Sequence, residues 1–295
     1  MRDPTWRWIA ETRGSVRYLL AEQPMVAHFR WDHHAWGSTW LFPLVAIASY
    51  LLLILLLKIL LIPRKRPLPL GPIPAIHNLC VVVASAAIFV GCWEATAVEI
   101  RETRWIRSRK FKNAVEWVMC FPLGTRPSGR VFFWSYIFYL TKYHQLFDTV
   151  IWILRKKPLT FLHVFHHIAV VFVCYAWLEF SQSLQIVAIL ATTLLYVVVY
   201  SYFLCRSIGW GCWSSLLPAN CQMVHLAFTL LAYVALLALH FTTTEGCNGM
   251  GAWLFDALSN ATFLLLFLNF YLKRYQGRSN TIKSLYSQQK NTKHL

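Results

Sequence analysis

The sequence predicts an all-α membrane protein with about seven transmembrane helices. Of its 295 residues, 57% are hydrophobic and only 14% are charged, which is far from the composition of a soluble globular domain. The hydrophobic residues also gather in runs of about 20, the length that a helix needs to cross the hydrocarbon core of a bilayer. Both observations argue against a water-soluble globule.

Seven apolar runs are long enough to span a bilayer. They are Trp40–Ile62, Ile73–Trp93, Phe132–Leu154, Leu162–Phe180, Leu184–Leu204, Ser215–His240 and Met250–Leu272. No internal repeat or linker of domain size separates them. We therefore predict an interfacial segment over residues 1–39, one membrane domain over residues 40–275 and a basic cytosolic tail over residues 276–295.

The basic residues predict the orientation of the chain. The formal net charge of +16 resides in loops and the tail, so membrane topology accounts for it better than nucleic-acid binding does. Cytoplasmic loops carry the excess of Lys and Arg. With seven spans, one side of the membrane collects Arg64–Arg66, Arg155–Lys157, Arg206 and the basic residues from Lys273 onward. This predicts an outside N-terminus and a cytosolic C-terminus, although the loop over residues 101–112, on the opposite side, is also basic.

The eight cysteines form no CxxC pair and no spacing typical of a metal finger. Most of them lie in apolar segments and are expected to be buried, unreactive thiols: Cys80, Cys92, Cys120, Cys174 and Cys205. The sequence leaves open whether a pair forms among the remaining three: Cys212, Cys221 and Cys247.

Polar residues interrupt several spans, and ionisable residues there are candidate functional sites because their burial in lipid is costly. In the third span, helical spacing places Lys142, Gln145 and Thr149 on one face. Asp148 lies beside them in the sequence. This part of the third span is therefore a candidate site.

A histidine box begins the fourth span. Its members, His163, His166 and His167, share an arc of about 100° around the helix. Two further polar groups lie in the fifth and sixth spans: Tyr196, Tyr200, Tyr202, Asn220, Gln222 and His225. With a rise of about 1.5 Å per residue, all the groups lie roughly 10 to 15 Å from the cytoplasmic edge. We therefore predict one shared site on the cytoplasmic side of the bilayer centre.

These residues also have simpler, structural interpretations. A single polar residue in a membrane helix can just hydrogen-bond to a neighbouring helix, as Thr149 or Gln222 would. For His144, His225 and His240, a structural role is favoured over a catalytic one. Three histidines within five residues, with a carboxylate at the same depth, are hard to explain by packing, so the box is predicted to be functional.

A metal centre is one chemistry that such a box permits, because imidazoles at positions i, i+3 and i+4 can share an ion. Membrane di-iron desaturases and hydroxylases resemble this chain in having an HxxHH box. They combine several such boxes, however, whereas this chain has one box and scattered histidines. The sequence therefore predicts neither metal ligands nor a cofactor.

The pattern resembles more closely that of the very-long-chain fatty acid elongase family. That family has a KxxExxDT segment, an HxxHH box and an HxxMYxYY-like motif, and the matching segments are Lys142–Thr149, His163–His167 and Tyr196–Phe203. The segments Trp177–Ser183 and Gly246–Phe255 resemble the plant-type branch of elongase-like proteins. The similarity covers residues 130–273 and the helical layout.

The resemblance implies a barrel-like helical bundle around an acyl-chain tunnel in the endoplasmic reticulum membrane. The implied reaction condenses a long-chain acyl-CoA with malonyl-CoA to give a 3-oxoacyl-CoA, carbon dioxide and CoA. The resemblance implies no cofactor beyond these substrates. It also implies membrane lipid as the surroundings and a reductase and a dehydratase of the elongation cycle as partners.

The resemblance assigns the nucleophile to His166, through an acyl-imidazole. A neutral imidazole is a competent acyl acceptor, and Asp148 or His163 can fix its tautomer. The developing oxyanion needs hydrogen-bond donors such as Lys142, His167 or a tyrosine hydroxyl.

Two positions depart from the family pattern. Gln145 replaces the glutamate of KxxExxDT, and Tyr196 stands where most members have histidine. We expect the Tyr196 hydroxyl to donate a hydrogen bond to the oxyanion rather than to form a covalent intermediate.

The CoA phosphates are expected near the basic residues Arg155, Lys156, Lys157 and Arg206, while the acyl chain runs between apolar helices toward the far leaflet. The residues expected to bind substrate near the box are Gln145, Thr149, Tyr200, Gln222 and His225.

Two other functions remain open at this point. One is a membrane non-haem iron desaturase or hydroxylase. The other is a catalytically impaired lipid-binding homologue, if Tyr196 has removed the chemistry.

Overall fold

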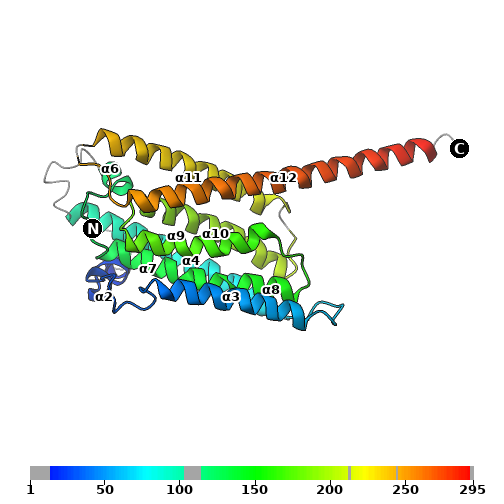
Figure 1. Ribbon diagram of the computed structural model, residues 1–295, viewed down its shortest axis with the longest axis horizontal. Helices are drawn as coiled ribbons and strands as arrows, with labels where there is room; N and C mark the ends of the chain where they lie inside the picture. Colours follow the sequence, from blue (N-terminus) through cyan, green and yellow to red (C-terminus); the bar gives the residue numbers. More distant parts are fainter. Residues whose placement is uncertain (1–13, 103–113, 212–213, 244, 293–295) are drawn as a thin grey trace, which may run out of the picture.

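The computed structural model describes residues 14–102, 114–211, 214–243 and 245–292. The chain folds as a bundle of roughly parallel and antiparallel helices, beyond which the last helix projects (Figure 1). In chain order these are η1 (Tyr18–Glu22), α2 (Pro24–Ala27), α3 (Leu41–Leu60), α4 (Ile73–Glu102), α6 (Ala114–Met119), α7 (Arg130–Gln145), α8 (Phe147–Leu154), α9 (Phe161–Glu179), α10 (Gln185–Ser207), α11 (Leu217–Thr242) and α12 (Met250–Thr292). Most of the basic second loop, from Arg104 to Lys112, and Cys212 lie outside the described residues. The predicted tail continues α12 as far as Thr292.

Six of the described helices are long and apolar enough to cross a membrane, namely α3, α4, α9, α10, α11 and the first part of α12. They confirm six of the seven predicted spans. In the most apolar part of α3, only 22% of the residues are buried inside the protein. Most side chains of this helix therefore face outward, as contact with lipid requires. The protein is an all-α, multi-pass membrane protein.

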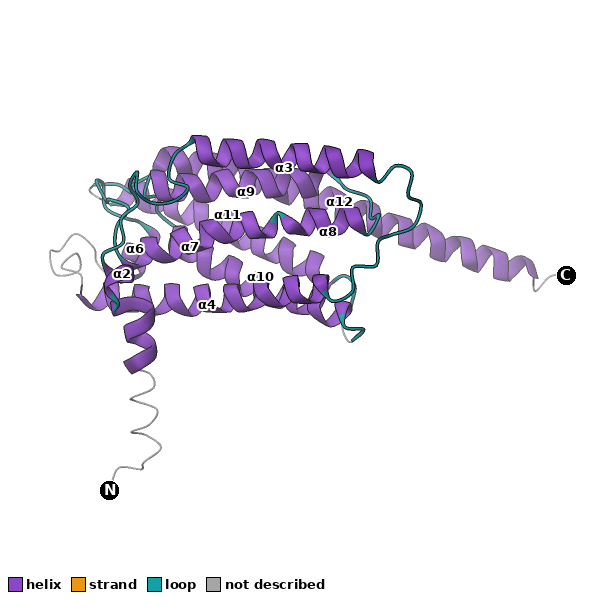
Figure 2. Cartoon of the chain, turned by 90° about the horizontal axis from the view of Figure 1, so that it is seen from below, coloured by secondary structure: helices purple, strands orange, loops and turns teal. Residues whose placement is uncertain are grey.

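The third predicted span is not one continuous helix. It is divided at Leu146 into α7 and α8, which follow one another along the bundle (Figure 2). At the break, the Leu146 amide bonds to the Tyr143 carbonyl and the Thr149 amide to the Leu146 carbonyl, both at 3.2 Å and both three residues apart. This tighter pattern interrupts the α-helix. The third predicted span is therefore formed by two helices, and the break between them lies within the polar segment Lys142–Thr149.

The helices close into a ring. α4 packs against α10, α10 against α11, α11 against α12, α12 against α9, α9 against α7, and α7 back against α4. α3 lies outside this ring, where it contacts α8 and α9. The ring confirms the expected barrel-like bundle and surrounds the space that the site occupies.

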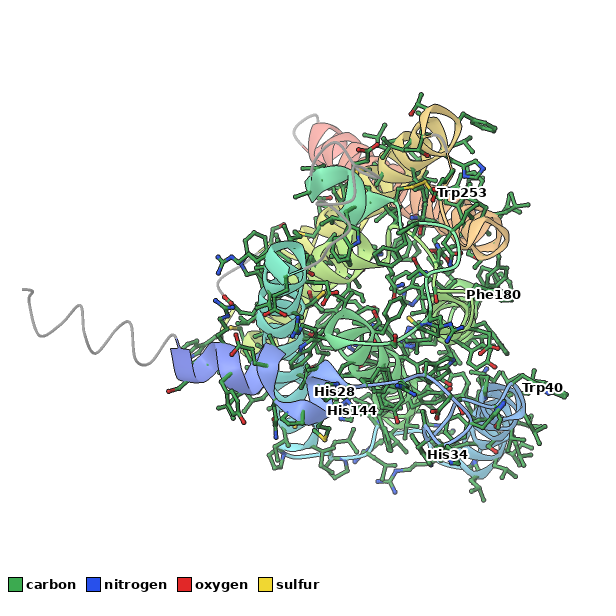
Figure 3. The ribbon with its side chains drawn as sticks, turned by 90° about the vertical axis from the view of Figure 1, so that its left-hand side faces the viewer. His28, His34, Trp40, His144, Phe180 and Trp253 are labelled. Atoms are coloured by element: carbon green, nitrogen blue, oxygen red, sulfur yellow. A yellow bond between two sulfur atoms is a disulfide. The ribbon has the colours of Figure 1, made fainter. Side chains whose placement is uncertain are left out.

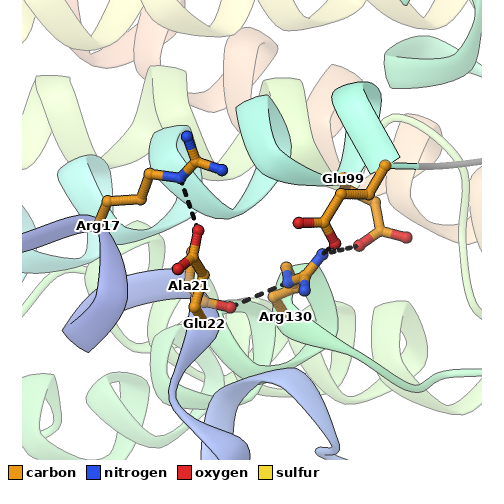
Figure 4. Close-up of polar contacts among 6 residues, drawn as sticks. Arg17, Ala21, Glu22, Glu99 and Arg130 are labelled. Carbon is orange, nitrogen blue, oxygen red and sulfur yellow. Dashed lines mark hydrogen bonds and ion pairs between the residues drawn. The ribbon is translucent and has the colours of Figure 1, made fainter. Parts of the chain in front are cut away.

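The N-terminal segment is fastened to one end of the ring by Arg130, at the start of α7. Its Nε donates to the Ala21 carbonyl at 2.9 Å, and its Nη1 lies 2.7 Å from Glu102 and 3.4 Å from Glu99, at the end of α4 (Figure 4). One guanidinium thus joins three segments, and its planar donors suit this role.

A disulfide joins Cys120, which follows α6, to Cys247, which precedes α12. It lies near Trp253, at the end of the bundle where α12 begins (Figure 3). The prediction of a free thiol at Cys120 was wrong, because ring closure brings together two residues 127 positions apart. The free cysteines among the described residues are Cys80, Cys92, Cys174, Cys205 and Cys221.

Candidate active site

The histidine box lies in the first turns of α9. Thr160 caps this helix, since its hydroxyl accepts a hydrogen bond from the His163 amide at 3.3 Å. The rings of His163 and His167 have centroids 4.6 Å apart, and those of His166 and His167 are 5.5 Å apart. The three imidazoles therefore form one cluster, as the sequence predicted.

His163 is held on the side of the cluster that faces α8. Its Nε2 lies 2.9 Å from the Thr149 hydroxyl, which is fully buried and also bonds to the Tyr50 hydroxyl of α3 at 2.7 Å. Thr149 thus positions a member of the box and connects it to the helix outside the ring. Tyr50 did not figure in the sequence analysis.

Asp148 is oriented by His77 and Tyr200 and not by His166. Its Oδ1 lies 2.9 Å from His77 Nε2 of α4, and its Oδ2 accepts a hydrogen bond from the Tyr200 hydroxyl. The expectation that Asp148 directly fixes the tautomer of His166 is not met by these contacts. Because α8 is separated from α7 by the break at Leu146, Asp148 turns toward α4 and α10 instead.

His77 is a site residue that sequence reasoning missed. It is 8% exposed, and its ring stacks on that of His144 at a centroid distance of 4.7 Å. The signal was present, because His77 is an ionisable residue inside a predicted span. Its partner could not be named without the packing of α4 against α7 and α8.

Lys142 is buried without a carboxylate partner among its described contacts. Its Nζ lies 3.5 Å from the centroid of the Phe138 ring and 4.5 Å from that of Tyr196. The Gln145 side-chain oxygen is 3.5 Å away. Aromatic faces attract a cation and so replace part of the stabilisation that an acidic residue would provide.

His166 opens onto a cavity inside the ring. Tyr196, Gln222 and His225 line the same cavity, from α10 and α11. His225 Nε2 lies 3.4 Å from the Thr192 hydroxyl, and the His166 ring is 5.1 Å from that of Phe263. The structure thus brings predicted residues of α9, α10 and α11 to one cavity. The predicted residues of the third span do not line it: Lys142, Gln145, Asp148 and Thr149.

Beyond these residues the cavity extends along the ring between mostly apolar walls. The apolar side chains include Phe138, Val170, Val173, Leu195 and Leu226. The far part is lined by Trp177, Tyr233, Asp256 and Asn260. A lining of mostly apolar side chains with an imidazole among them is suited to a hydrocarbon chain with one reactive end.

The predicted CoA-binding residues lie at the end of the ring where α8 and α10 finish. Lys157 Nζ lies 4.5 Å from the centroid of the Trp152 ring. Partial loss of solvation lowers the pKa of Lys157 below its ordinary value, and the positive charges of Arg155 and Arg206 lower it further. Lys156 has a different use, since its Nζ donates to the Leu61 carbonyl at the end of α3. The other three cations form a field suited to a polyanion.

Comparison with known proteins identifies the family. Residues 35–283 match the ELO family model, described as the GNS1/SUR4 family. The chain belongs to this family. It is 43% identical to fatty acid elongase 3-like of Arabidopsis thaliana over 283 residues, which cover 93% of this chain and 97% of that protein. Fatty acid elongase A of Dictyostelium discoideum is 31% identical over 266 residues, covering 88% of this chain and 92% of its own length.

The two departures from the elongase pattern lie next to each other in space. Tyr196, at the usual histidine position, places its ring against Lys142, and Gln145, at the usual glutamate position, is the nearest polar partner of the same ammonium group. Both departures therefore change the surroundings of Lys142, which this member of the GNS1/SUR4 family stabilises by aromatic rings.

Proposed function

We propose that this protein is a 3-oxoacyl-CoA synthase, the condensing enzyme of fatty acid elongation, and that His166 carries its covalent chemistry. Family membership supports the activity, and members of this family act on acyl-CoA substrates in a membrane. The observation that supports the site is the opening of His166 onto an apolar cavity within the helical ring. The second substrate is malonyl-CoA.

In the first half of the reaction, a neutral His166 nitrogen attacks the thioester carbonyl of the acyl-CoA. The nitrogen–carbon bond forms, the carbon–sulfur bond breaks, and CoA leaves after its sulfur takes the proton released by the imidazole. In the second half, malonyl-CoA loses carbon dioxide, and its carbanion equivalent attacks the acyl carbonyl. A carbon–carbon bond forms and the bond to His166 breaks. The released imidazole nitrogen takes up a proton from solvent, and the 3-oxoacyl-CoA is released.

Both halves develop negative charge on the acyl oxygen. Tyr196 and His225 line the cavity beside His166, and the Lys142 ammonium lies against Tyr196. These groups, together with His167, are candidates to stabilise the oxyanion, by hydrogen bonds or by charge. His77, Asp148 and Tyr200 act at a distance, because they position the wall of the site rather than touch the acyl group.

The CoA moiety is expected at the basic end of the ring, beside Arg155, Lys157 and Arg206. We expect Lys157→Gln to raise KM for malonyl-CoA about 5- to 10-fold with little change in kcat, because a charge that contacts phosphate stabilises binding rather than the reaction. Lys157→Arg, which keeps the charge, should stay near wild type. Because the pKa of Lys157 is lowered, its charge is lost as pH rises, so KM should climb at alkaline pH in wild type and less so in Lys157→Arg. Equal KM values for all three proteins would contradict this role.

The disulfide supports an orientation in which the Cys120–Cys247 end faces the lumen of the endoplasmic reticulum, since disulfides persist in oxidising compartments. The basic end then faces the cytosol, where the CoA substrates are. We expect a reporter fused after Leu295 to be cytosolic, and a Cys120→Ser variant to leave Cys247 open to lumenal alkylation. A lumenal reporter would reverse the orientation. The reductase and dehydratase of the cycle would meet the product on the cytosolic side.

The activity itself is tested with purified protein, labelled malonyl-CoA and a panel of acyl-CoAs. We expect 3-oxoacyl-CoA to form without added metal and to persist in the presence of chelators. Among the described residues, no group of three or more side chains drawn from His, Cys, Asp and Glu is arranged to hold a metal ion. Near-stoichiometric iron that rises and falls with activity would favour a lipid desaturase or hydroxylase instead.

A further inference from the structure

The cavity contains a polar side chain that the condensation reaction does not use. Asn260 of α12 lines the cavity and is 7% exposed. Its side-chain oxygen, Oδ1, has no hydrogen-bond partner among the residues that the structure describes. A buried acceptor without a partner is destabilising, so its presence needs an explanation.

The direction of this oxygen follows from the neighbouring hydrogen bonds. Thr229 of α11 has one hydroxyl proton, which it directs to the backbone carbonyls of His225 at 3.1 Å and Leu226 at 3.0 Å. Its oxygen then accepts from the amide nitrogen of Asn260, which faces Thr229. Oδ1 is therefore on the side away from Thr229.

The other polar group of this wall is already satisfied. Asp256, one turn earlier on α12, accepts hydrogen bonds from Trp177 Nε1 at 2.7 Å and Gln182 Nε2 at 3.0 Å, and it also bonds to Tyr233. These hydrogen bonds explain why a buried carboxyl group is present at Asp256. Asn260 is the residue of this wall that retains an unused acceptor.

The depth of Asn260 relative to His166 can be read from two helices. Phe263, whose ring contacts that of His166, lies three residues after Asn260, which is about 4.5 Å along the axis of α12. Thr229 lies one turn after His225, or about 6 Å along α11. Along the bundle axis, Asn260 therefore lies roughly 5 Å deeper in the cavity than the level of His166.

We propose that Asn260 binds a hydroxyl group on the acyl chain, so that this enzyme recognises hydroxylated acyl-CoAs. This inference rests on the proposed function, because it assumes that the acyl chain occupies the cavity. A hydroxyl supplies the donor that Oδ1 lacks, whereas a double bond, an epoxide or a ketone supplies none. Since each carbon advances a chain by less than one bond of about 1.5 Å, the hydroxyl belongs about four to six carbons from the thioester carbonyl.

The test compares acyl-CoAs of one chain length that carry a hydroxyl at each of carbons 3 to 9, or none. Binding is measured on the purified full-length protein by competition with the labelled unsubstituted acyl-CoA, and kcat/KM is measured separately with malonyl-CoA. We expect one isomer, with its hydroxyl near carbons 5 to 7, to bind about 5- to 10-fold more tightly than the unsubstituted chain, the range for one added hydrogen bond.

Asn260→Leu, which keeps the volume but removes the acceptor, should abolish this preference. Asn78→Leu is the matched control, since Asn78 is also 7% exposed but lies on α4 outside the cavity, and the preference should survive it. If Asn260→Leu does not fold, binding of the isomers to Asn260→Ala and to wild type still tests the proposal. Equal binding of all isomers by wild type, or a preference retained without Asn260, would overturn the proposal.

The outcomes separate this inference from the proposed function. Condensation of unsubstituted chains without any hydroxyl preference would leave the function standing and refute the role of Asn260. A hydroxyl preference in binding without condensation would support Asn260 and refute the enzyme assignment. Failure of every acyl-CoA to bind would refute both.

Discussion

His166→Ala is expected to abolish condensation, with a loss of at least about 1000-fold in kcat/KM. The alanine removes the only atom to which we assign the acyl group, and the remaining donors cannot replace a covalent step. The fold should persist, because the His166 ring contacts the cavity and neighbouring rings rather than a buried charge. The measurement is turnover with labelled malonyl-CoA, together with thermal stability of the purified variant.

Two further variants serve as controls for this result. His163→Ala and Asp148→Asn should lower the rate less than His166→Ala, because each residue orients its surroundings through contacts that do not include His166. Mass spectrometry of protein quenched with acyl-CoA alone should locate the acyl group on His166. Normal turnover in His166→Ala, or an acyl group found on another residue, would refute the assignment.

Tyr196→Phe is expected to reduce turnover by roughly 10- to 1000-fold, the range for losing one donor to a developing oxyanion. The phenyl ring of the variant should still pack against Lys142, whose Nζ lies 4.5 Å from the Tyr196 ring centroid, so the change isolates the hydroxyl. The loss should appear in kcat more than in KM, since the oxyanion exists only in the transition state and the intermediate.

Tyr196→His provides the comparison with the usual residue of the family. We expect it to retain more activity than Tyr196→Phe, because an imidazole N–H can also donate. The trapped acyl group should remain on His166 in all of these proteins. Full activity of Tyr196→Phe would make Tyr196 a packing residue, and its proposed role would be lost.

The family departures also bear on how Lys142 works. In the common pattern a glutamate would stand at Gln145, and a carboxylate there would form an ion pair with the Lys142 ammonium. Here two aromatic faces and an amide take that place. An ammonium group that is not paired with a carboxylate can interact more strongly with negative charge on the substrate. Lys142 lies against the ring of Tyr196, which lines the cavity.

Much of the fold was predictable from composition and run length. Six long apolar helices are present where the sequence predicted them, because a membrane-spanning helix satisfies its own backbone and requires only enough apolar residues. The histidine box was predictable for a related reason. Helical spacing alone decides that His163, His166 and His167 share one face of α9, and the cost of burying polar groups in lipid marks them as candidates for function.

Other features depended on contacts between segments far apart in the sequence. The break at Leu146, the Cys120–Cys247 disulfide and the pairing of His77 with Asp148 all follow from the way the helices pack around the ring. Local spacing carries no information about which helix lies opposite another. The same holds for Asn260, which is an ordinary polar residue in the sequence. Only the orientation of Thr229 on the neighbouring helix makes Asn260 a free acceptor, because that hydroxyl has a single proton and has already given it to its own backbone.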